Sequence, residues 1–405
     1  MTSNQDIIAM SNAAFINTYT RFPVAMVEGR GCILTDADGR EYLDFLSGIA
    51  VCGLGHCHPA VTRAICEQAG KLVHVSNLFH TLPQTELAAA LVAHSFADRV
   101  FFANSGAEAN EAAIKLARIA SPAGKYEIIS LEGSFHGRTL ATVAATGQKK
   151  FHQGFEPMPQ GFSSAPFGDL DALAAMITPA TCAILCEPLQ GESGVRPLSR
   201  GYLHGIRQLC DQHGLLLIFD EVQVGMGRTG TLFAHEQLGV TPDIMTLAKA
   251  IGNGLPLGAM LTTEKIAAAF APGTHASTFG GNPVSCAAGL AVMTTMLSPG
   301  FLYHVKAQGA YLAERLTELA AKYPSLAQGV RGMGLIQGMV LTEAGVAQGP
   351  GIIKALFEQG VLANFAGNVA LRFIPPLIVS EAEIDRMIVT LDMTLGACCD
   401  TLGTV

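Results

Sequence analysis

Short runs of apolar and β-branched residues recur through the middle of the chain, and stretches with helical spacing separate them. Strands that are buried on both faces have this continuous apolar pattern, and helices between successive strands indicate a parallel sheet. The pattern therefore predicts a large, mostly parallel α/β domain over residues 51–290. Its expected strands are residues 100–103, 127–131, 183–186, 215–219 and 243–247.

The N-terminal part of the chain has a different pattern. Residues 32–34 and 41–45 flank the turn Asp36-Ala37-Asp38-Gly39. Glycine adopts a positive φ at little cost, so this turn favours a hairpin. We expect residues 1–50 to contain the hairpin and to join the C-terminal part of the chain in a second, smaller domain.

Residues 291–405 are predicted to form that smaller α+β domain. Ser380 and Glu383 have the spacing of a capping box, which predicts that the last helix begins there. The elements expected before it are a helix at 303–323, a strand at 335–341, a helix at 352–359 and a strand that ends at Phe373.

Composition narrows the classes of protein. Of the 405 residues only 14% are charged and 49% are hydrophobic, which excludes a disordered chain. The net charge of −8 and the lack of a basic run argue against a nucleic-acid partner. The longest weakly polar stretch, residues 283–297, is shorter than the roughly 20 apolar residues of a membrane span. Because the first basic residue is Arg21, the start does not read as a secretory signal, and we expect a cytoplasmic enzyme without membrane contact.

The ten cysteines are scattered through the chain without a C-x-x-C pair, which favours reduced thiols over disulfides. His56-Cys57-His58 is the one cluster that resembles a set of metal ligands. Three adjacent residues do not easily converge on one ion, and no second cluster follows at a suitable spacing. We therefore expect no metal.

Ligands of parallel α/β sheets bind beyond the carboxyl ends of the strands, so the residues after each apolar run are candidates for chemistry. The run at 100–103 is followed by Asn104-Ser105-Gly106-Ala107 and then by a helical pattern. Free backbone N–H groups at a helix start suit a phosphate group. The alternative is an ordinary N-cap that binds no ligand.

An acidic pair and a lysine follow two later strands. Asp220 and Glu221 come directly after residues 215–219, where a desolvated carboxylate needs a cationic partner or serves as a cap for the next turn. Lys249 lies among apolar and glycine residues. A desolvated lysine can form a Schiff base, although an isolated lysine more often extends to water. Together, a phosphate site, a strand-end acid and this lysine are the groups that hold pyridoxal phosphate (PLP).

Five motifs and Lys249 occur in the order found in the class III (subgroup II) PLP-dependent aminotransferases, and the chain resembles that family over nearly its whole length. The motifs are residues 104–111 (NSGAEANE), 135–139 (FHGRT), 187–192 (EPLQGE), 220–223 (DEVQ) and 225–230 (GMGRTG). The resemblance implies a fold-type I PLP-dependent transferase, in which a mostly parallel α/β domain carries the cofactor and a smaller α+β domain packs beside it.

Within the family, the chain is most similar to the acetylornithine aminotransferases. Residues 53–59 (GLGHCHP), 74–79 (HVSNLF) and 277–283 (STFGGNP) carry this similarity. Ornithine aminotransferases tend to have tryptophan at the position of His136, and this chain has no tryptophan. Ala107 departs from the family, where threonine is common, and we expect the loss of a hydroxyl to weaken cofactor binding without abolishing it.

The resemblance implies specific contacts with the cofactor. Lys249 would bind it as an imine and then move the proton between substrate and cofactor. Asp220 would pair with the pyridine nitrogen, Gln223 would bond the ring hydroxyl, and Phe135 would stack on the ring. The other expected cofactor contacts are Ser105, Gly106 and Ala107 at the phosphate, Thr278 of the neighbouring subunit, and Glu221 and Val222 beside Asp220. A site shared in this way implies a homodimer.

The resemblance also implies two places for substrate carboxylates. Arg138 and Ser277 would hold the α-carboxylate of N-acetylornithine. Arg372 would hold the α-carboxylate of glutamate or 2-oxoglutarate, and Glu192 would cover it while the other substrate is bound. Bidentate arginine suits carboxylate recognition, although a structural ion pair is the alternative for Arg372.

The expected reaction transfers the ω-amino group of N-acetylornithine to 2-oxoglutarate, as in arginine biosynthesis. Succinylornithine, succinyl-diaminopimelate, 4-aminobutyrate and ornithine remain alternative amino donors. An aminomutase that rearranges glutamate semialdehyde is disfavoured by residues 135–139. A binding protein without catalysis is disfavoured by the presence of Lys249.

Overall fold

The computed structural model describes residues 2–402, and its largest element is a seven-stranded sheet. All neighbouring strands pair in parallel except β12, which is antiparallel to both β11 and β4. In sheet order the strands are β4 (Arg99–Ala103), β12 (Gly258–Thr262), β11 (Ile244–Leu247), β10 (Leu216–Asp220), β7 (Thr181–Cys186), β5 (Glu127–Leu131) and β6 (Phe162–Ala165). The predicted α/β class and mostly parallel sheet are confirmed.

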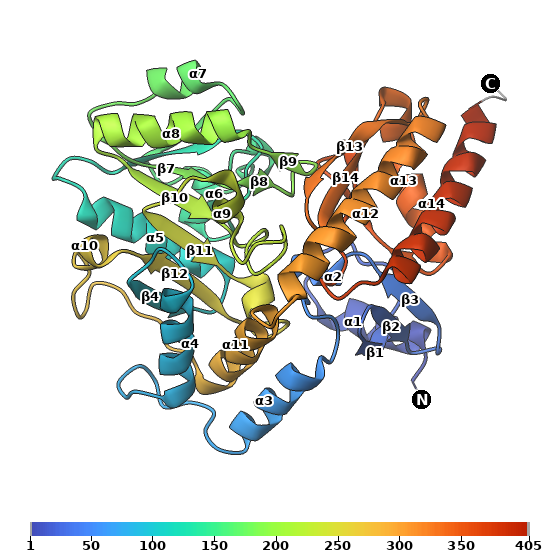
Figure 1. The fold of residues 1–405 in the computed structure, drawn as a ribbon, viewed down its shortest axis with the longest axis horizontal. Coiled ribbons are helices and arrows are strands. Elements are labelled where there is room, and N and C mark those ends of the chain that lie inside the picture. The colour runs from blue at the N-terminus through green and yellow to red at the C-terminus, as the bar shows by residue number, and fades with distance from the viewer. Residues whose placement is uncertain (1, 403–405) are drawn as a thin grey trace.

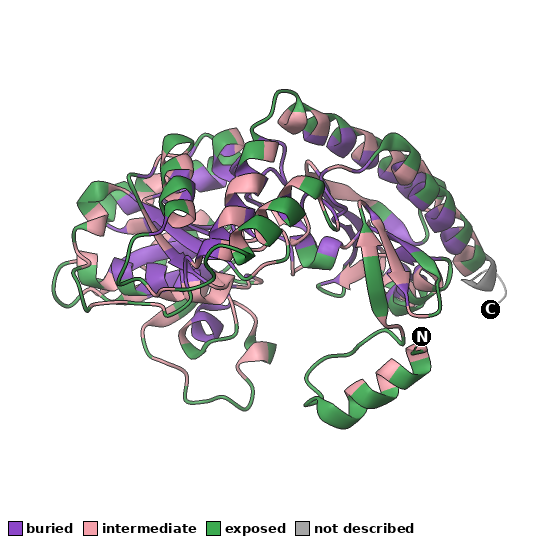
Figure 2. Ribbon diagram, turned by 90° about the horizontal axis from the view of Figure 1, so that it is seen from below, coloured by how far each residue is buried: buried purple, intermediate pink, exposed green. Residues whose placement is uncertain are grey.

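Helices cover this sheet and form the left-hand lobe of Figure 1. α5 packs on the sheet through a face rich in alanine, with Ala109, Ala112, Ala113 and Leu116 fully or almost fully buried. The helices of this region are α3 (Pro59–Ala69), α4 (Leu82–Ala93), α5 (Gly106–Ala120), α6 (Leu140–Ala145), α7 (Leu170–Ala175), α8 (Arg200–His213), α9 (Ala234–Leu238), α10 (Glu264–Ala267) and α11 (Pro283–Met296). Figure 2 shows the buried sheet between exposed helical faces.

The two ends of the chain share a second sheet. β3 pairs with β15 in parallel, with Val361 opposite Leu43, so the blue N-terminal strands lie beside the orange C-terminal segments in Figure 1. This sheet contains β1 (Met26–Arg30), β2 (Ile33–Asp36), β3 (Glu41–Asp44) and β15 (Val361–Leu362), and its N-terminal helices are α1 (Asn4–Ala14) and α2 (Ser47–Ala50). The predicted hairpin is present, while the domain boundaries at residues 50 and 290 remain a prediction.

The C-terminal region is a four-stranded antiparallel sheet covered by long helices. The strands, in order, are β13 (Ala327–Met333), β14 (Ile336–Leu341), β17 (Ala370–Phe373) and β16 (Asn364–Ala366). The helices are α12 (Phe301–Lys322), α13 (Glu343–Glu358) and α14 (Glu381–Leu402). The predicted capping box is present, since the Glu383 backbone N–H donates to the Ser380 hydroxyl at 3.3 Å and the Ser380 N–H donates to Glu383 at 2.8 Å.

Several elements differ from the sequence prediction, among them α13, β6, β12 and β13. α13 begins at Glu343 instead of residue 352, because the Thr342 side chain caps it and it tolerates Pro350 within its length. β6 and β12 were not predicted, since β6 is short and polar and β12 follows a loop rich in glycine and proline. Patterns of glycine and proline usually mark loops, and tertiary packing overrides them here.

One arginine joins the large sheet region to the C-terminal sheet. Arg228 follows β10 and is 1% exposed, and its Nη1 donates to the backbone oxygens of Leu335, at 2.9 Å, and of Pro375. Burial lowers the pKa of Arg228 to about 9. These two hydrogen bonds tie the loop after β10 to the segments that carry Leu335 and Pro375.

Among the described residues, no single helix has both the length and the apolar composition that crossing a bilayer requires. α11 and α12 meet that requirement only when counted together, and they are bent by 74° at the break between them.

We predict opposite effects of alanine at two helical glycines. A Cβ at Gly309 in α12 would lie 2.5 Å from the backbone of Gly334, whereas a Cβ at Gly351 in α13 meets nothing within 4 Å. Gly309→Ala should destabilise the protein by about 1–3 kcal/mol through overpacking. Gly351→Ala should stabilise it by about 0.5–1 kcal/mol through helix propensity. Thermal unfolding compares the two variants, and a Gly309→Ala protein as stable as the wild type would contradict the packing described.

Candidate active site

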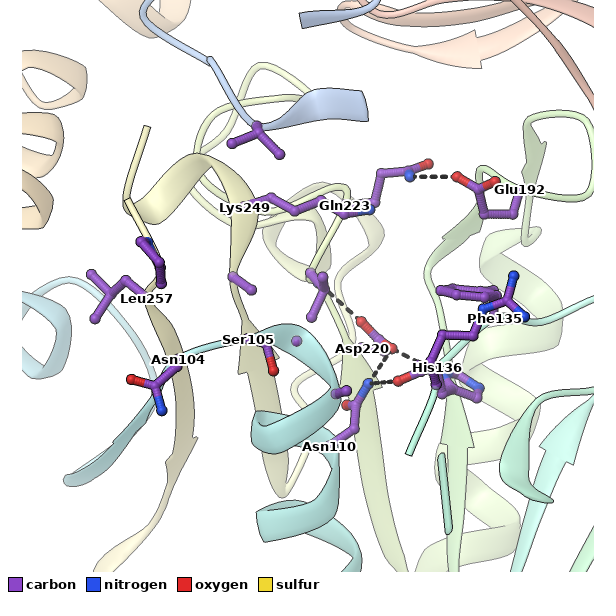
Figure 3. Close-up of a pocket in the computed structure, with 18 of the residues that line it drawn as sticks. Asn104, Ser105, Asn110, Phe135, His136, Glu192, Asp220, Gln223, Lys249 and Leu257 are labelled. Carbon is purple, nitrogen blue, oxygen red and sulfur yellow. Dashed lines mark hydrogen bonds and ion pairs between the residues drawn. The ribbon is translucent and has the colours of Figure 1, made fainter. Parts of the chain in front are cut away.

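A cavity of about 470 Å³ lies at the carboxyl ends of the strands of the large sheet (Figure 3). Its wall comes from residues that directly follow β4, β5, β7, β10 and β11, which are far apart in the sequence. Most of the predicted site residues line it, namely Ser105, Gly106, Ala107, Phe135, Arg138, Glu192, Asp220, Val222, Gln223 and Lys249.

The start of α5 forms one wall of the cavity. Ser105 is the N-cap, and its hydroxyl accepts the Glu108 N–H at 3.2 Å, so the ordinary capping interpretation holds for this side chain. Gly106 and Ala107, in the first turn, also line the cavity. A Cβ at Gly106 would lie 2.7 Å from Val222 Cγ1, so only glycine fits this close approach. Helix starts of this kind bind phosphate groups through their backbone N–H groups.

Asp220 ends β10 and is held by a buried network. Its Oδ2 accepts from Asn110 Nδ2 at 2.7 Å and lies 2.8 Å from His136 Nδ1, and its Oδ1 accepts from the Val222 N–H at 3.0 Å. Thr246 in turn donates to Asn110 Oδ1 at 2.7 Å. Figure 3 shows Asn110 and His136 on one side of Asp220 and Lys249 on the other. The network fixes the direction of the carboxylate toward the cavity.

Lys249 follows β11 and enters the cavity from a short 3₁₀ turn, with φ at +52°. Within residues 2–402, its Nζ makes neither a hydrogen bond nor an ion pair. Burial lowers the pKa of Lys249; the charge of Glu192 opposes this shift and that of Arg372 adds to it. A desolvated amine with a lowered pKa is the state that attacks a carbonyl carbon.

Arg372, on β17, and Glu192, in the turn between β8 (Leu189–Gln190) and β9 (Arg196–Pro197), form an ion pair of 2.8 Å. The Arg372 side chain is fully buried, and its Nε also donates to Asn364 at 3.0 Å. Burial alone would raise the pKa of Glu192, but the charges of Arg372 and Lys249 and the hydrogen bonds to it lower that pKa to about 2. Within the part of the chain that the structure describes, Arg372 Nη2 has no hydrogen-bond partner, so the guanidinium retains an unused donor.

Phe135 and Arg138 form another part of the cavity wall. Arg138 is exposed, and its guanidinium carbon lies 4.2 Å from the centroid of Phe151 and 5.4 Å from that of Phe135. The aromatic rings hold the cation by their negative faces, and its donors remain available to a ligand.

Four predicted site residues do not line this cavity. Arg372 is one of them, and it bonds to Glu192 and Gln223, which do line it. The Glu221 carboxylate turns away and accepts from the backbone N–H groups of Ala234, at 2.6 Å, and His235, at 2.8 Å, where it caps α9. The Glu221 carboxylate therefore has a capping role, and the expected contact of Glu221 with the cofactor stays a prediction. Ser277 and Thr278 line a neighbouring hollow, and the Ser277 hydroxyl accepts from Asn104 at 3.2 Å.

Among the cavity residues that received no role from the sequence, three make contacts that shape the site. Asn110 and His136 orient Asp220, and Glu187 is a buried carboxyl that accepts the Phe135 N–H at 3.0 Å. Burial, and then the charge of Asp220, raise the pKa of Glu187 well above its ordinary value. Asn110, a polar residue on the buried face of an alanine-rich helix, is the one signal that the sequence offered.

No group of three or more His, Cys, Asp or Glu side chains that could hold a metal ion occurs among residues 2–402.

Comparisons with known proteins agree on one family. Residues 14–395 match the family described as Aminotransferase class-III. The chain is 49% identical to an acetylornithine aminotransferase of Myxococcus xanthus, over 95% of this chain and 96% of that one.

Two solved structures extend the similarity to the fold. An N-acetylornithine aminotransferase of Stenotrophomonas maltophilia has a TM-score of 0.84 and 38% identity, covering 97% of this chain and 100% of that one. An ornithine aminotransferase of Toxoplasma gondii, described with partial occupancy of PLP at its active site, has a TM-score of 0.93 and 30% identity, covering 99% of this chain and 96% of that one.

We predict that Lys249→Met makes the cofactor-free protein more stable at pH 7. In the unfolded chain a lysine binds its proton up to about pH 10.4, whereas burial lowers the pKa in the folded chain. Between the two values the unfolded chain binds more protons, so wild-type stability rises with pH. The advantage of the variant should therefore shrink between pH 7 and about pH 10. Thermal unfolding at several pH values measures it, and identical pH dependence of the two proteins would contradict the assignment.

Proposed function

The chain belongs to the class-III aminotransferases, and we propose that it transfers the ω-amino group of N2-acetyl-L-ornithine to 2-oxoglutarate, giving N-acetyl-L-glutamate 5-semialdehyde and L-glutamate. Arginine biosynthesis is the pathway in which this reaction would serve. The fold-type I architecture and the PLP dependence expected from the sequence are confirmed by the family match.

The described residues fit this cofactor. A helix start with backbone N–H groups suits its phosphate, the Asp220 carboxylate is fixed beside the cavity, and Lys249 is an amine without a partner. When bound, PLP carries the amino group between the two substrates and withdraws electrons from the reacting carbon.

Each residue is assigned the task that its position allows. Ser105, Gly106 and Ala107 bind the phosphate at the start of α5. With the cofactor bound, Asp220 would hold a proton on the pyridine nitrogen, Val222 and Phe135 would enclose the ring, and Gln223 would reach the ring hydroxyl. Lys249 would anchor the cofactor, and its released Nζ would move the proton to and from the reacting carbon.

The observation that carries the proposal is the pairing of a fully buried Arg372 with Glu192 beside a cavity that also contains Arg138. N-acetylornithine presents an amino group far from its α-carboxylate, whereas glutamate presents one next to it. A single site serves both substrates if each arginine binds one of them. Arg138 would bind the carboxylate of N-acetylornithine while Glu192 covers Arg372, and Arg372 would bind the α-carboxylate of glutamate after Glu192 leaves.

We propose that the enzyme is a homodimer. Ser277 and Thr278 lie in an exposed hollow outside their own cavity, and Leu78 and Phe79 nearby are 86% and 66% exposed. A second copy would cover this surface and bring Ser277 to the substrate and Thr278 to the phosphate. Sedimentation should give a particle of two 42.4-kDa chains. An active monomer would contradict the shared site.

We also propose a cytoplasmic location, because buried thiols such as Cys182, Cys186 and Cys210 are typical of a reducing compartment. Recovery of the protein in a secreted or membrane fraction would contradict it.

The amino donor is tested in single-turnover experiments without any 2-oxoacid. We predict that N-acetylornithine changes the absorbance of the bound cofactor at least about tenfold faster than ornithine or 4-aminobutyrate does. Of these three amines, only N-acetylornithine has both an acyl group to pack in the cavity and an α-carboxylate to bind Arg138. Succinylornithine and succinyl-diaminopimelate belong in the same series. A faster reaction with free ornithine or 4-aminobutyrate would overturn the substrate and leave the family intact.

A further inference from the structure

The amide of Gln223 lies between the two members of the Arg372–Glu192 pair. Its Nε2 donates to Glu192 Oε1 at 3.1 Å, and its Oε1 accepts from Arg372 Nη1 at 3.2 Å. Glu192 Oε1 and Arg372 Nη1 are themselves 2.8 Å apart. The three groups form a closed ring of hydrogen bonds in which each bond has a charged partner, and Figure 3 shows Gln223 directed at Glu192.

The amide of Gln223 occupies the space beside Gly191 that a side chain there would fill. A Cβ at Gly191 would lie 1.5 Å from Gln223 Oε1 and 3.3 Å from Arg372 Nη1. Gly191 immediately precedes Glu192, so the turn that carries the gating carboxylate also accommodates the amide. An alanine here would displace the amide, so the lack of a side chain at Gly191 gives Gln223 its place beside the pair.

We propose that Gln223 determines substrate specificity by holding Glu192 on Arg372, and so raises the cost of admitting an α-carboxylate to this arginine. This inference rests on the proposed function, in which Glu192 must leave Arg372 before glutamate or 2-oxoglutarate binds. Leaving breaks the ion pair and also the hydrogen bond from Gln223 to Glu192. Hydrogen bonds to charged groups contribute more than neutral ones, so this contact resists opening of the pair.

The expected contact of Gln223 with the cofactor is compatible with this role. A glutamine amide has two N–H donors, and one of them is directed to Glu192. The second remains for the ring hydroxyl. Gln223 is therefore a positioning residue for the Arg372–Glu192 pair as well as a proposed cofactor contact.

Two variants test the inference by different means. Gln223→Met keeps the side-chain length and removes both hydrogen bonds, whereas Gly191→Ala keeps Gln223 and displaces its amide. For each, single-turnover kcat/KM is measured with N-acetylornithine and with L-glutamate. We expect kcat/KM for L-glutamate, divided by kcat/KM for N-acetylornithine, to rise about tenfold in both variants. Loss of a cofactor contact alone lowers both rates by the same factor and leaves the ratio unchanged, which would overturn the inference.

A double-mutant cycle isolates the contact with Glu192. In a Glu192→Ala background nothing is left for Gln223 to hold, so Gln223→Met should leave the ratio unchanged there. If Gln223→Met changes the ratio by the same factor with and without Glu192, Gln223 acts on the substrate directly and the inference fails.

Binding to the cofactor-free protein gives a readout that does not depend on the reaction. Glutarate, a non-reacting dicarboxylate, must displace Glu192 to reach Arg372, and calorimetry should show a Kd about tenfold lower in Gln223→Met than in the wild type. An equal or higher Kd would overturn the role of Gln223. If the wild type reacts with glutamate but not with N-acetylornithine, the proposed function fails, and the glutarate experiment still decides the inference.

Discussion

Asp220 and Arg372 carry charges that lie out of water, and the partners that hold them come from distant parts of the chain. Asp220 is 3% exposed and the Arg372 side chain is fully buried, so each charge would be costly without a fixed counterpart. Asn110 and His136 hold the aspartate, while Glu192, Gln223 and Asn364 hold the arginine. Among the described residues, no side chain bonds to the amine of Lys249, which leaves this amine for the proposed bond to the cofactor.

This requirement explains why the site lies between two sheets. The large sheet supplies Asp220 and Lys249 at the ends of β10 and β11, and the C-terminal sheet supplies Arg372 on β17. Arg228 fixes the two regions through the backbone oxygens of Leu335 and Pro375. The pairing of β3 with β15 also ties the N-terminal strands to the C-terminal part. A gate between the regions can then work by movement of one carboxylate, with the backbone in place.

Much of this arrangement was predictable from sequence, because it depends on local signals. Continuous apolar runs marked the five strands, and the residues that follow them gave the helix start at Ser105, the acid Asp220 and the lysine Lys249. The supporting contacts were not predictable from spacing, since Asn110 and His136 meet Asp220 across 110 and 84 residues. The capping role of Glu221 was not predictable either, since its carboxylate is directed to the start of α9, 13 and 14 residues further along the chain. The position of Gln223 between Glu192 and Arg372 likewise depends on tertiary structure.

In the proposed mechanism, one cavity binds two substrate carboxylates with two arginines, the exposed Arg138 and Arg372, which Glu192 covers. Steady-state kinetics of Arg138→Ala and Arg372→Ala separate the two roles, with KM determined for both substrates in each variant. We expect Arg138→Ala to raise the KM for N-acetylornithine by about tenfold or more and the KM for 2-oxoglutarate far less. Arg372→Ala should raise the KM for 2-oxoglutarate by about tenfold or more and the KM for N-acetylornithine far less. Equal increases for both substrates in both variants would contradict the separate roles of the two arginines.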